Sequence, residues 1–172
     1  MRCHKVTLEP LSIETLEQLR VWRNSHSINR YMDYRQTITH EQQVKWFEQK
    51  KKSSDSFYII RHQSEPIGMT HLDQMDEVKN TAYAGLFIGE KRFQGTGVAL
   101  SASLLVLEIG FEQLNLNTIY AKVSEQNRVA LDYNLAIGFT RDGKESKGFL
   151  RLKMDSATYH SNKSRLSSLL TL

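Results

Sequence analysis

Two glycines, one residue apart, stand directly before the most apolar stretch of the chain, in the segment 92–100, RFQGTGVAL. From Leu100 to Leu114, leucine and phenylalanine recur at steps of four, three, four and three, which is the spacing of one helical face. A helix N-terminus carries unsatisfied N–H donors and a partial positive charge, and glycine lets the backbone approach a ligand without a Cβ. The pattern predicts a helix over Thr96–Gln113 whose N-terminal end binds an anion.

Two familiar nucleotide motifs do not fit this segment. A phosphate-binding P-loop requires a lysine after its last glycine, and no lysine stands at that place. A dinucleotide-binding fingerprint requires a tight turn right after the strand and a small third residue, whereas five residues separate Gly89 from Gly95 and Leu100 takes the third position. A loop that the glycines merely shape remains as a third interpretation.

The remaining periodicities predict an α/β fold. We expect strands at 4–11, 57–62, 67–76, 82–89 and 117–124, and a last hairpin of two strands that ends in 149–155. Turns are expected at 64–68 and 138–143, and helices at 13–24, 39–51 and 129–137. The order βααβββαβαββ indicates helices packed on a mixed, mostly antiparallel sheet.

Length and composition limit the classes of function. A chain of 172 residues suits one domain spanning 1–172, with a Ser- and Leu-rich tail from about 156 that is free to be flexible. The net charge of +4 is too mild to indicate nucleic acid, and no apolar run is long enough for a membrane span, so we expect neither partner and a cytoplasmic protein. Cys3 is the only cysteine, which excludes an intramolecular disulfide. The six histidines lack metal-ligand spacing, so we expect no metal; His40 and His71 are the two worth watching.

The glycine segment resembles the acyl-CoA motif of the GNAT N-acetyltransferase superfamily through the spacing Arg92-x-x-Gly95-x-Gly97. The later segment 127–139, NRVALDYNLAIGF, is similar to a second motif of that superfamily. The resemblance implies a GNAT fold whose sheet splays between its fourth and fifth strands, 83–88 and 118–123, with the pantetheine arm of acetyl-CoA in the gap like an added strand. The cofactor-binding residues that it implies are Ile88, Arg92, Phe93, Gln94, Gly95, Thr96, Gly97, Val98, Asn127 and Ala130.

One position departs from the superfamily pattern. The tyrosine that protonates the leaving thiolate usually stands five residues before the phenylalanine of the "GF" pair, and that place holds Asn134, with Tyr133 one residue earlier. A shift by one residue turns a side chain by about 100° around the helix axis. Tyr133 is our candidate acid, with core packing as its alternative role. Glu125 is our candidate base, with stabilisation of a helix N-terminus as its alternative role.

The N-terminal half is similar to acetyltransferases of sugar-nucleotide pathways, above all to the N-acetyltransferase of pseudaminic acid biosynthesis. The segments LRVWRNSHSINRYM and ITHEQQVKWF carry this likeness. It implies direct acetyl transfer to the 4-amino group of a UDP-linked amino-dideoxy sugar, and it allows a homodimer. Three arginines suit a diphosphate, whereas a polyamine site calls for more carboxylates than the single one in 20–40. Ribosomal-protein and polyamine acetyltransferases share parts of the pattern and remain alternatives, as does a non-catalytic acyl-CoA-binding module. The implied substrate-binding residues are Trp22, Arg23, Asn24 and Tyr83, with Arg30 and Arg35 as the further arginines.

Overall fold

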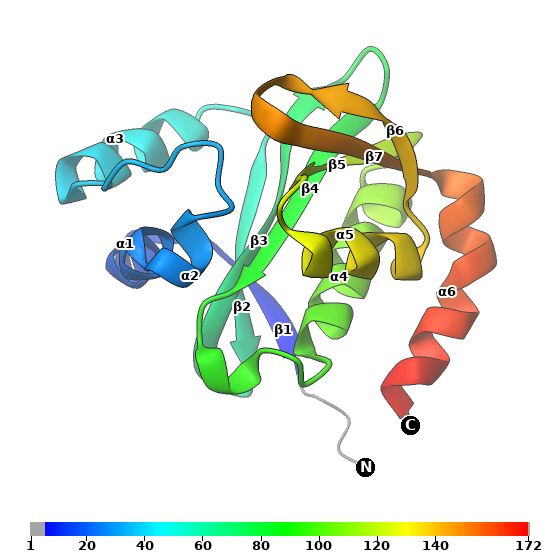
Figure 1. Cartoon of the computed structure of the whole chain (residues 1–172), viewed down its shortest axis with the longest axis horizontal. Helices are drawn as coiled ribbons and strands as arrows, with labels where there is room; N and C mark the ends of the chain where they lie inside the picture. The colour runs from blue at the N-terminus through cyan, green and yellow to red at the C-terminus, as the bar shows by residue number, and fades with distance from the viewer. Residues whose placement is uncertain (1–5, 172) are drawn as a thin grey trace.

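The computed structural model describes residues 6–171, so the expectation for Cys3 lies outside the described residues. The main elements appear in Figure 1. The strands of the described part are β1 (Val6–Pro10), β2 (Ser56–His62), β3 (Glu65–Asp76), β4 (Thr81–Ile88), β5 (Thr118–Ser124), β6 (Thr140–Glu145) and β7 (Phe149–Asp155). Its α-helices are α1 (Leu16–Asn24), α2 (His26–Asn29), α3 (His40–Lys50), α4 (Val98–Glu108), α5 (Arg128–Ile137) and α6 (Ser156–Thr171).

The strands form one seven-stranded sheet in the order β1-β2-β3-β4-β5-β7-β6. All neighbours are antiparallel except β4 and β5, which are parallel. Helices α1, α2 and α3 lie on one side of the sheet, and α4, α5 and α6 lie on the other (Figure 1). The expected α/β class, with a mixed and mostly antiparallel sheet, is confirmed.

The pairing between β4 and β5 is short. It covers Thr81–Tyr83 against Thr118–Tyr120, and no residue pair joins the later part of β4, 84–88, to the later part of β5, 121–124. Each later part keeps its outer neighbour, β3 or β7. The sheet therefore opens into a seam between its fourth and fifth strands, as expected from the family resemblance.

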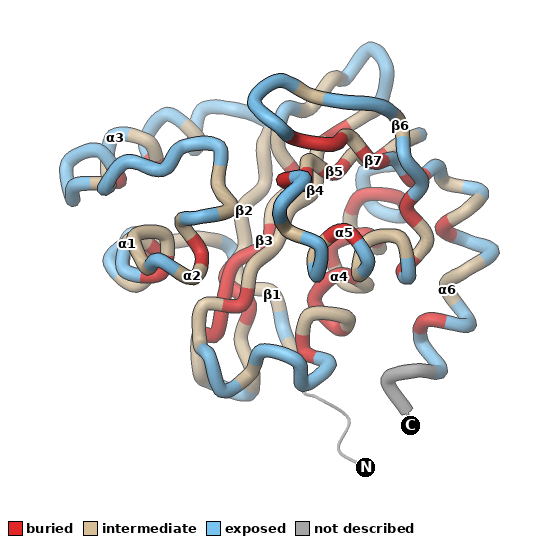
Figure 2. Tube along the Cα trace, viewed as in Figure 1, coloured by how far each residue is buried: buried red, intermediate tan, exposed pale blue. Residues whose placement is uncertain are grey.

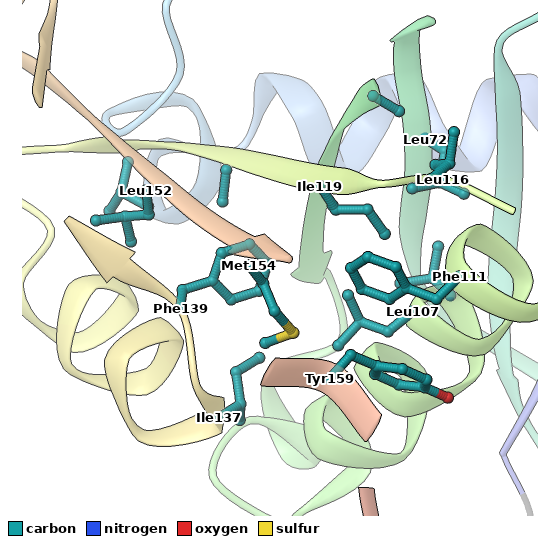
Figure 3. Packing of buried hydrophobic residues seen from close by; sticks show 14 of the residues in the cluster. Leu72, Leu107, Phe111, Leu116, Ile119, Ile137, Phe139, Leu152, Met154 and Tyr159 are labelled. Carbon is teal, nitrogen blue, oxygen red and sulfur yellow. The ribbon is translucent and has the colours of Figure 1, made fainter. Parts of the chain in front are cut away.

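Helix α4 runs through the main core. Its buried residues point in several directions rather than along one stripe, and they are Val98, Ser101, Ala102, Ser103, Val106 and Leu107. In Figure 3, Leu107 and Phe111 lie between Ile119 of β5 and Tyr159 of α6. Because neighbours surround the helix, its N-terminal end is held firmly in place, while the preceding segment lies at the surface (Figure 2).

The apolar helix is shorter than expected. It ends at Glu108 and continues as a π-helical turn over Ile109–Gln113, in which the Leu114 N–H donates to the Ile109 carbonyl. This wider turn changes the helical phase, and Leu114, expected on the buried face, is 41% exposed. Gly110 allows the close packing here, since a Cβ would lie 2.5 Å from the Ile119 Cδ1.

Both expected turns are misplaced. The β2–β3 turn falls at Gln63 and Ser64, and Pro66 belongs to β3, beside a register shift that accommodates a residue without an N–H. The second expected turn, 138–143, is mostly strand. Gly138, with φ of 112°, ends α5, and β6 begins at Thr140.

The tail from Ser156 is helical, which its composition did not indicate. Tyr159 of α6 is 1% exposed, stacks on Phe111 with ring centroids 4.9 Å apart, and donates a 2.8 Å hydrogen bond to Glu112. Leu166 is also buried. Serines face solvent on the other sides of the helix, so two anchoring residues suffice to fix a segment that resembles a linker.

Candidate active site

The residues before α4 form an open array of backbone donors. Gly97 caps the helix with φ of 88°, and Gly95 has φ of 76°, a left-handed conformation that favours glycine. The N–H groups of Gly95, Gly97 and Val98 donate to no acceptor within residues 6–171. A Cβ added at Gly95 would meet nothing within 4 Å. There is therefore room for an anionic group against these donors, as acetyl-CoA requires.

Other residues of the predicted cofactor set hold this loop from within. The Gln94 side chain donates to the Ile88 carbonyl at 2.8 Å, and the Thr96 hydroxyl donates to the Phe93 carbonyl at 2.7 Å. Phe93 packs against His62, with ring centroids 5.0 Å apart. These side chains fix the conformation of the loop, which leaves the backbone to face a ligand.

Arg92 lies at the surface beside this loop. Its side chain is 66% exposed and forms an ion pair with Glu65, while its guanidinium carbon lies 4.9 Å from the centre of the Phe93 ring. A contact between Arg92 and the cofactor stays a prediction, and such a contact would compete with Glu65.

Helix α5 contributes the second motif. Asn127 is its N-cap, and the Asn127 side-chain oxygen accepts the Ala130 N–H at 3.2 Å. The Tyr133 hydroxyl lies 2.7 Å from the Ser103 hydroxyl on α4. Burial raises the pKa of Tyr133 to about 12, so this phenol keeps its proton at neutral pH. Asn134 donates to the Ala130 carbonyl of its own helix at 2.7 Å.

Polar side chains surround the point where β4 and β5 pair. Tyr83 donates a 3.0 Å hydrogen bond to Glu145 and stacks on Tyr120, with ring centroids 5.3 Å apart. Burial, with the neighbouring Glu145 carboxylate, raises the pKa of Tyr83. Arg151 lies 3.8 Å from Glu145 and donates to Asp142 at 2.7 Å. Tyr83 thus stands at the last position of β4 that pairs with β5, within a network that reaches β6 and β7.

The side chains of Trp22 and Asn24 form hydrogen bonds to other residues of this protein. Trp22 is 4% exposed, donates to Glu90 at 2.9 Å, and packs so closely on Gly89 that a Cβ there would lie 2.4 Å from the indole. Asn24 donates to the Ile38 carbonyl at 2.9 Å and accepts the Ile38 N–H at 2.8 Å. Both side chains hold the N-terminal layer together, and their predicted contacts with substrate stay predictions.

A buried polar cluster appears that the sequence pattern did not assemble. The cluster consists of Arg23, His71 and Asp73, and the Arg23 Nε, His71 Nδ1 and Asp73 Oδ1 are buried without a hydrogen-bond partner in the described structure. Burial lowers the pKa of Arg23. Sequence analysis named Arg23 and His71 separately, and a further signal is Gly85, because a glycine inside a strand often marks a close approach.

The other candidates lie in ion pairs or local contacts. Glu125, after β5, is 40% exposed and lies 3.1 Å from the Lys144 ammonium of β6. Arg30 stacks on its neighbour Tyr31, and Arg35 donates to the nearby Met32 carbonyl. Arg23, Arg30 and Arg35 thus have separate surroundings, and their joint binding of a diphosphate stays a prediction.

Residues 6–171 contain no group of three or more His, Cys, Asp or Glu side chains arranged to hold a metal ion. In the same part of the chain, no helix is long and apolar enough to cross a membrane.

Comparison with known proteins places this site in a family. The family model described as "Acetyltransferase (GNAT) domain" matches residues 5–140. The chain is 25% identical over 156 residues to a spermidine N(1)-acetyltransferase of Escherichia coli K12, covering 82% of this chain and 76% of that protein. It is 25% identical over 151 residues to a putative ribosomal N-acetyltransferase, YdaF, of Bacillus subtilis 168, covering 82% and 79% of the two chains.

Solved structures show the same fold. The spermidine N-acetyltransferase of Vibrio cholerae, in complex with CoA and spermine, superposes with a TM-score of 0.82 at 19% identity, covering 91% of this chain and 98% of that one. A putative acetyltransferase of T. thermophilus gives a TM-score of 0.80 at 20% identity, with 96% and 93% covered. Together with the donor array before α4 and the open seam, the family match over most of the chain shows that this protein belongs to the GNAT acetyltransferase family and is an acetyl-CoA-dependent N-acetyltransferase.

Proposed function

We propose that the backbone of Gly95–Val98 binds the pyrophosphate of acetyl-CoA and that the acetyl group meets a primary amine at the seam. The observation that carries this proposal is the row of N–H donors without acceptors in the described structure at Gly95, Gly97 and Val98, in a loop that is exposed at Gly95–Gly97 and has open space around Gly95. Helix dipole and donors act on the anion together. The later parts of β4 and β5 lack a partner on the seam side and leave strand edges to which an extended arm can bond.

Acetyl-CoA, when bound, supplies an activated acyl group on a good leaving group. The protein then has to hold the thioester carbonyl against a strand N–H, position the amine, and handle two protons. We assign the proton of the leaving thiolate to Tyr133, which keeps its phenolic proton at neutral pH. Its bond to Ser103 orients the hydroxyl.

The relatives named as spermidine acetyltransferases support a polyamine as the acceptor. The YdaF relative, named as a putative ribosomal acetyltransferase, supports a protein N-terminus less directly. Spermidine is therefore the first acceptor to test.

A UDP-linked amino sugar is the second candidate, because the carboxylates that could bind a polycation already have partners within the protein. Asp33 already holds Lys122 at 2.8 Å and Lys147 at 3.2 Å, and Glu145 accepts from Tyr83. A polycation would have to displace these partners. Arg23 offers a buried donor without an acceptor, which an oxygen-rich substrate satisfies and a polyamine does not.

The test is a thiol-release assay with acetyl-CoA and three acceptors: spermidine, a UDP-linked 4-amino-dideoxy sugar, and a peptide with a ribosomal-protein N-terminus. We expect turnover with one of the two small molecules. Spermidine turnover selects the polyamine, and sugar turnover selects the sugar nucleotide. Turnover of the peptide alone would contradict a small-molecule acceptor. Acetyl-CoA binding without any turnover would indicate a non-catalytic binding module.

A further inference from the structure

His71 lies across β4 at the point where the sheet begins to open. It pairs with Gly85, two residues beyond Tyr83, the last residue of β4 that pairs with β5. A Cβ on Gly85 would lie 2.6 Å from the His71 Cε1 and 2.8 Å from its Nε2. The missing side chain of Gly85 is thus what allows the imidazole to lie over the strand that borders the seam.

The surroundings of this imidazole are incomplete. The His71 Nε2 lies 3.8 Å from the Asp73 Oδ1, too far for a hydrogen bond, and the Phe57 ring packs beside it with centroids 5.5 Å apart. The His71 Nδ1 and the Asp73 Oδ1 have no hydrogen-bond partner in residues 6–171, nor has the Arg23 Nε. Buried polar atoms in native proteins are nearly always satisfied. Three unsatisfied atoms in one cluster therefore point to a ligand that brings its own polar groups.

We propose that His71, with Asp73 beside it, accepts the proton of the acceptor amine during acetyl transfer. The acceptor ammonium gives one proton to the imidazole, and the amine nitrogen then forms a bond to the acetyl carbon. The carbon–sulfur bond breaks, the thiolate takes a proton from Tyr133, and the Tyr133 phenolate regains a proton from the newly acylated nitrogen. This assignment rests on the proposed function and names the base for it.

The charges around His71 suit this task. Burial is the largest effect and lowers the pKa of His71 from its ordinary value of 6.5. Arg23 from α1 and Lys50 from α3 lower it further, whereas Asp73 and Asp55 oppose them. The imidazole is thus neutral at pH 7 and free to accept a proton. Activity is expected to fall as the pH drops through this lowered pKa, that is, below pH 6.5.

Glu125, the base that the sequence suggested, has a less suitable place. Its carboxylate is 40% exposed and lies in an ion pair with Lys144, beyond the end of β5. The His71 ring lies over Gly85 of β4, two residues beyond the last β4–β5 pair. The two assignments give different predictions for the same assay.

The test compares His71→Gln with the parent, using spermidine and the UDP-linked amino sugar as acceptors. We expect kcat/KM at pH 7 to fall by about 10²–10⁴-fold, the usual contribution of a general base. The loss should shrink with each unit of rising pH, because the amine then deprotonates without help. A loss that stays constant from about pH 6 to about pH 9 would overturn the proposal. His160→Gln, at an exposed position on α6, is the control and should change kcat/KM by less than about twofold.

A second variant addresses orientation without touching the imidazole. Gly85→Ala places a methyl group where the His71 ring lies, so the ring must move. We expect a reduced kcat with the affinity for acetyl-CoA unchanged. An unchanged kcat would overturn the placement of His71 at the reacting amine.

A third measurement separates this proposal from the proposed function. In an NMR titration of the histidine side chains, saturating acetyl-CoA should shift the His71 ring signals and leave those of His160 in place. If the His71 signals shift but no amine is acetylated, the proposed acetyltransferase function is refuted, while the position of His71 beside the acetyl group is supported. An unmoved His71 signal would overturn the inference regardless of turnover.

Discussion

The N-terminal end of α4 and the polar face opposite it are built in different ways. The first is made of backbone, with donors at Gly95, Gly97 and Val98 and a helix fixed by core neighbours. The second is made of side chains from distant elements, such as Tyr83 with Glu145 and Arg23 with His71. A backbone site needs only a local glycine pattern, which the sequence displays openly. A side-chain site is assembled by the fold and leaves little local pattern.

The largest effect is expected from a variant that blocks the backbone donors before α4. Gly95→Val places a side chain in the open space before α4, where we place the pyrophosphate. Charge-assisted hydrogen bonds contribute about 1.5–3 kcal/mol each, so losing two weakens acetyl-CoA binding by about 100-fold or more. Isothermal titration calorimetry measures this.

Gly148→Val is the matched control for that variant. Gly148 has φ of 75°, against 76° for Gly95, and its Cβ would also meet nothing within 4 Å. Both variants therefore carry similar backbone strain, but only Gly95→Val should lose affinity. Equal affinities in the two variants would place the cofactor elsewhere.

The next effect tests the proton donor. Tyr133→Phe should lower kcat by about 10²-fold, the low end for general acid catalysis, with little change in KM, because the proton is needed late on the reaction path. Ser103→Ala keeps the phenol and removes its hydrogen-bond partner, so its loss should be smaller. If kcat does not change in Tyr133→Phe, the residue only packs the core and the thiolate takes its proton from solvent.

A smaller effect tests whether Trp22 stabilises the fold or contacts the substrate. Trp22→Phe keeps a buried ring and loses the hydrogen bond to Glu90. We expect the free energy of unfolding in urea to fall by about 1–3 kcal/mol, with the KM for the acceptor unchanged. Trp46→Phe is the control, since the Trp46 indole N–H bonds no residue in the described chain. A raised acceptor KM with unchanged stability would instead support Trp22 as a substrate contact.

The smallest effect concerns the rim of the backbone site. Arg92→Ala should weaken acetyl-CoA binding by less than about fivefold, because exposed charge contacts contribute little. Glu65→Gln frees Arg92 and should leave the affinity equal or higher. A loss of about 50-fold or more in Arg92→Ala, measured by calorimetry, would move Arg92 from the rim to the centre of the site.

The same contrast explains what sequence analysis could reach. Gly95 and Gly97 before an apolar segment predicted both a helix start and an anion site, and the order of strands followed from local periodicity. The burial of Trp22 against Gly89 could not be predicted, because it depends on a contact 67 residues away (89 minus 22), and the predicted contact of Trp22 with substrate stays a prediction.

Other features that the sequence did not predict also depend on contacts between distant segments. His71 and Gly85 lie on different strands, and only the antiparallel register of β3 and β4 brings them together. The π-helical turn at Ile109–Gln113 responds to packing against Ile119 and leaves no sequence signal of its own. The anchoring of α6 through Tyr159 likewise depends on Phe111, which lies on another helical turn.

The short pairing between β4 and β5 has a consequence for how the chain folds. Strands β2, β3 and β4 pair through short connections, β1 joins β2 across the segment that contains α1 to α3, and β6 and β7 form a hairpin. The two halves join through parallel pairs at only three positions, across the connection that contains α4. Closing this connection costs loop entropy, and only these few pairs join the two halves directly to offset it. We therefore expect the pairing of β4 with β5 to be the last and least cooperative step of folding. The proposed active site would then form last.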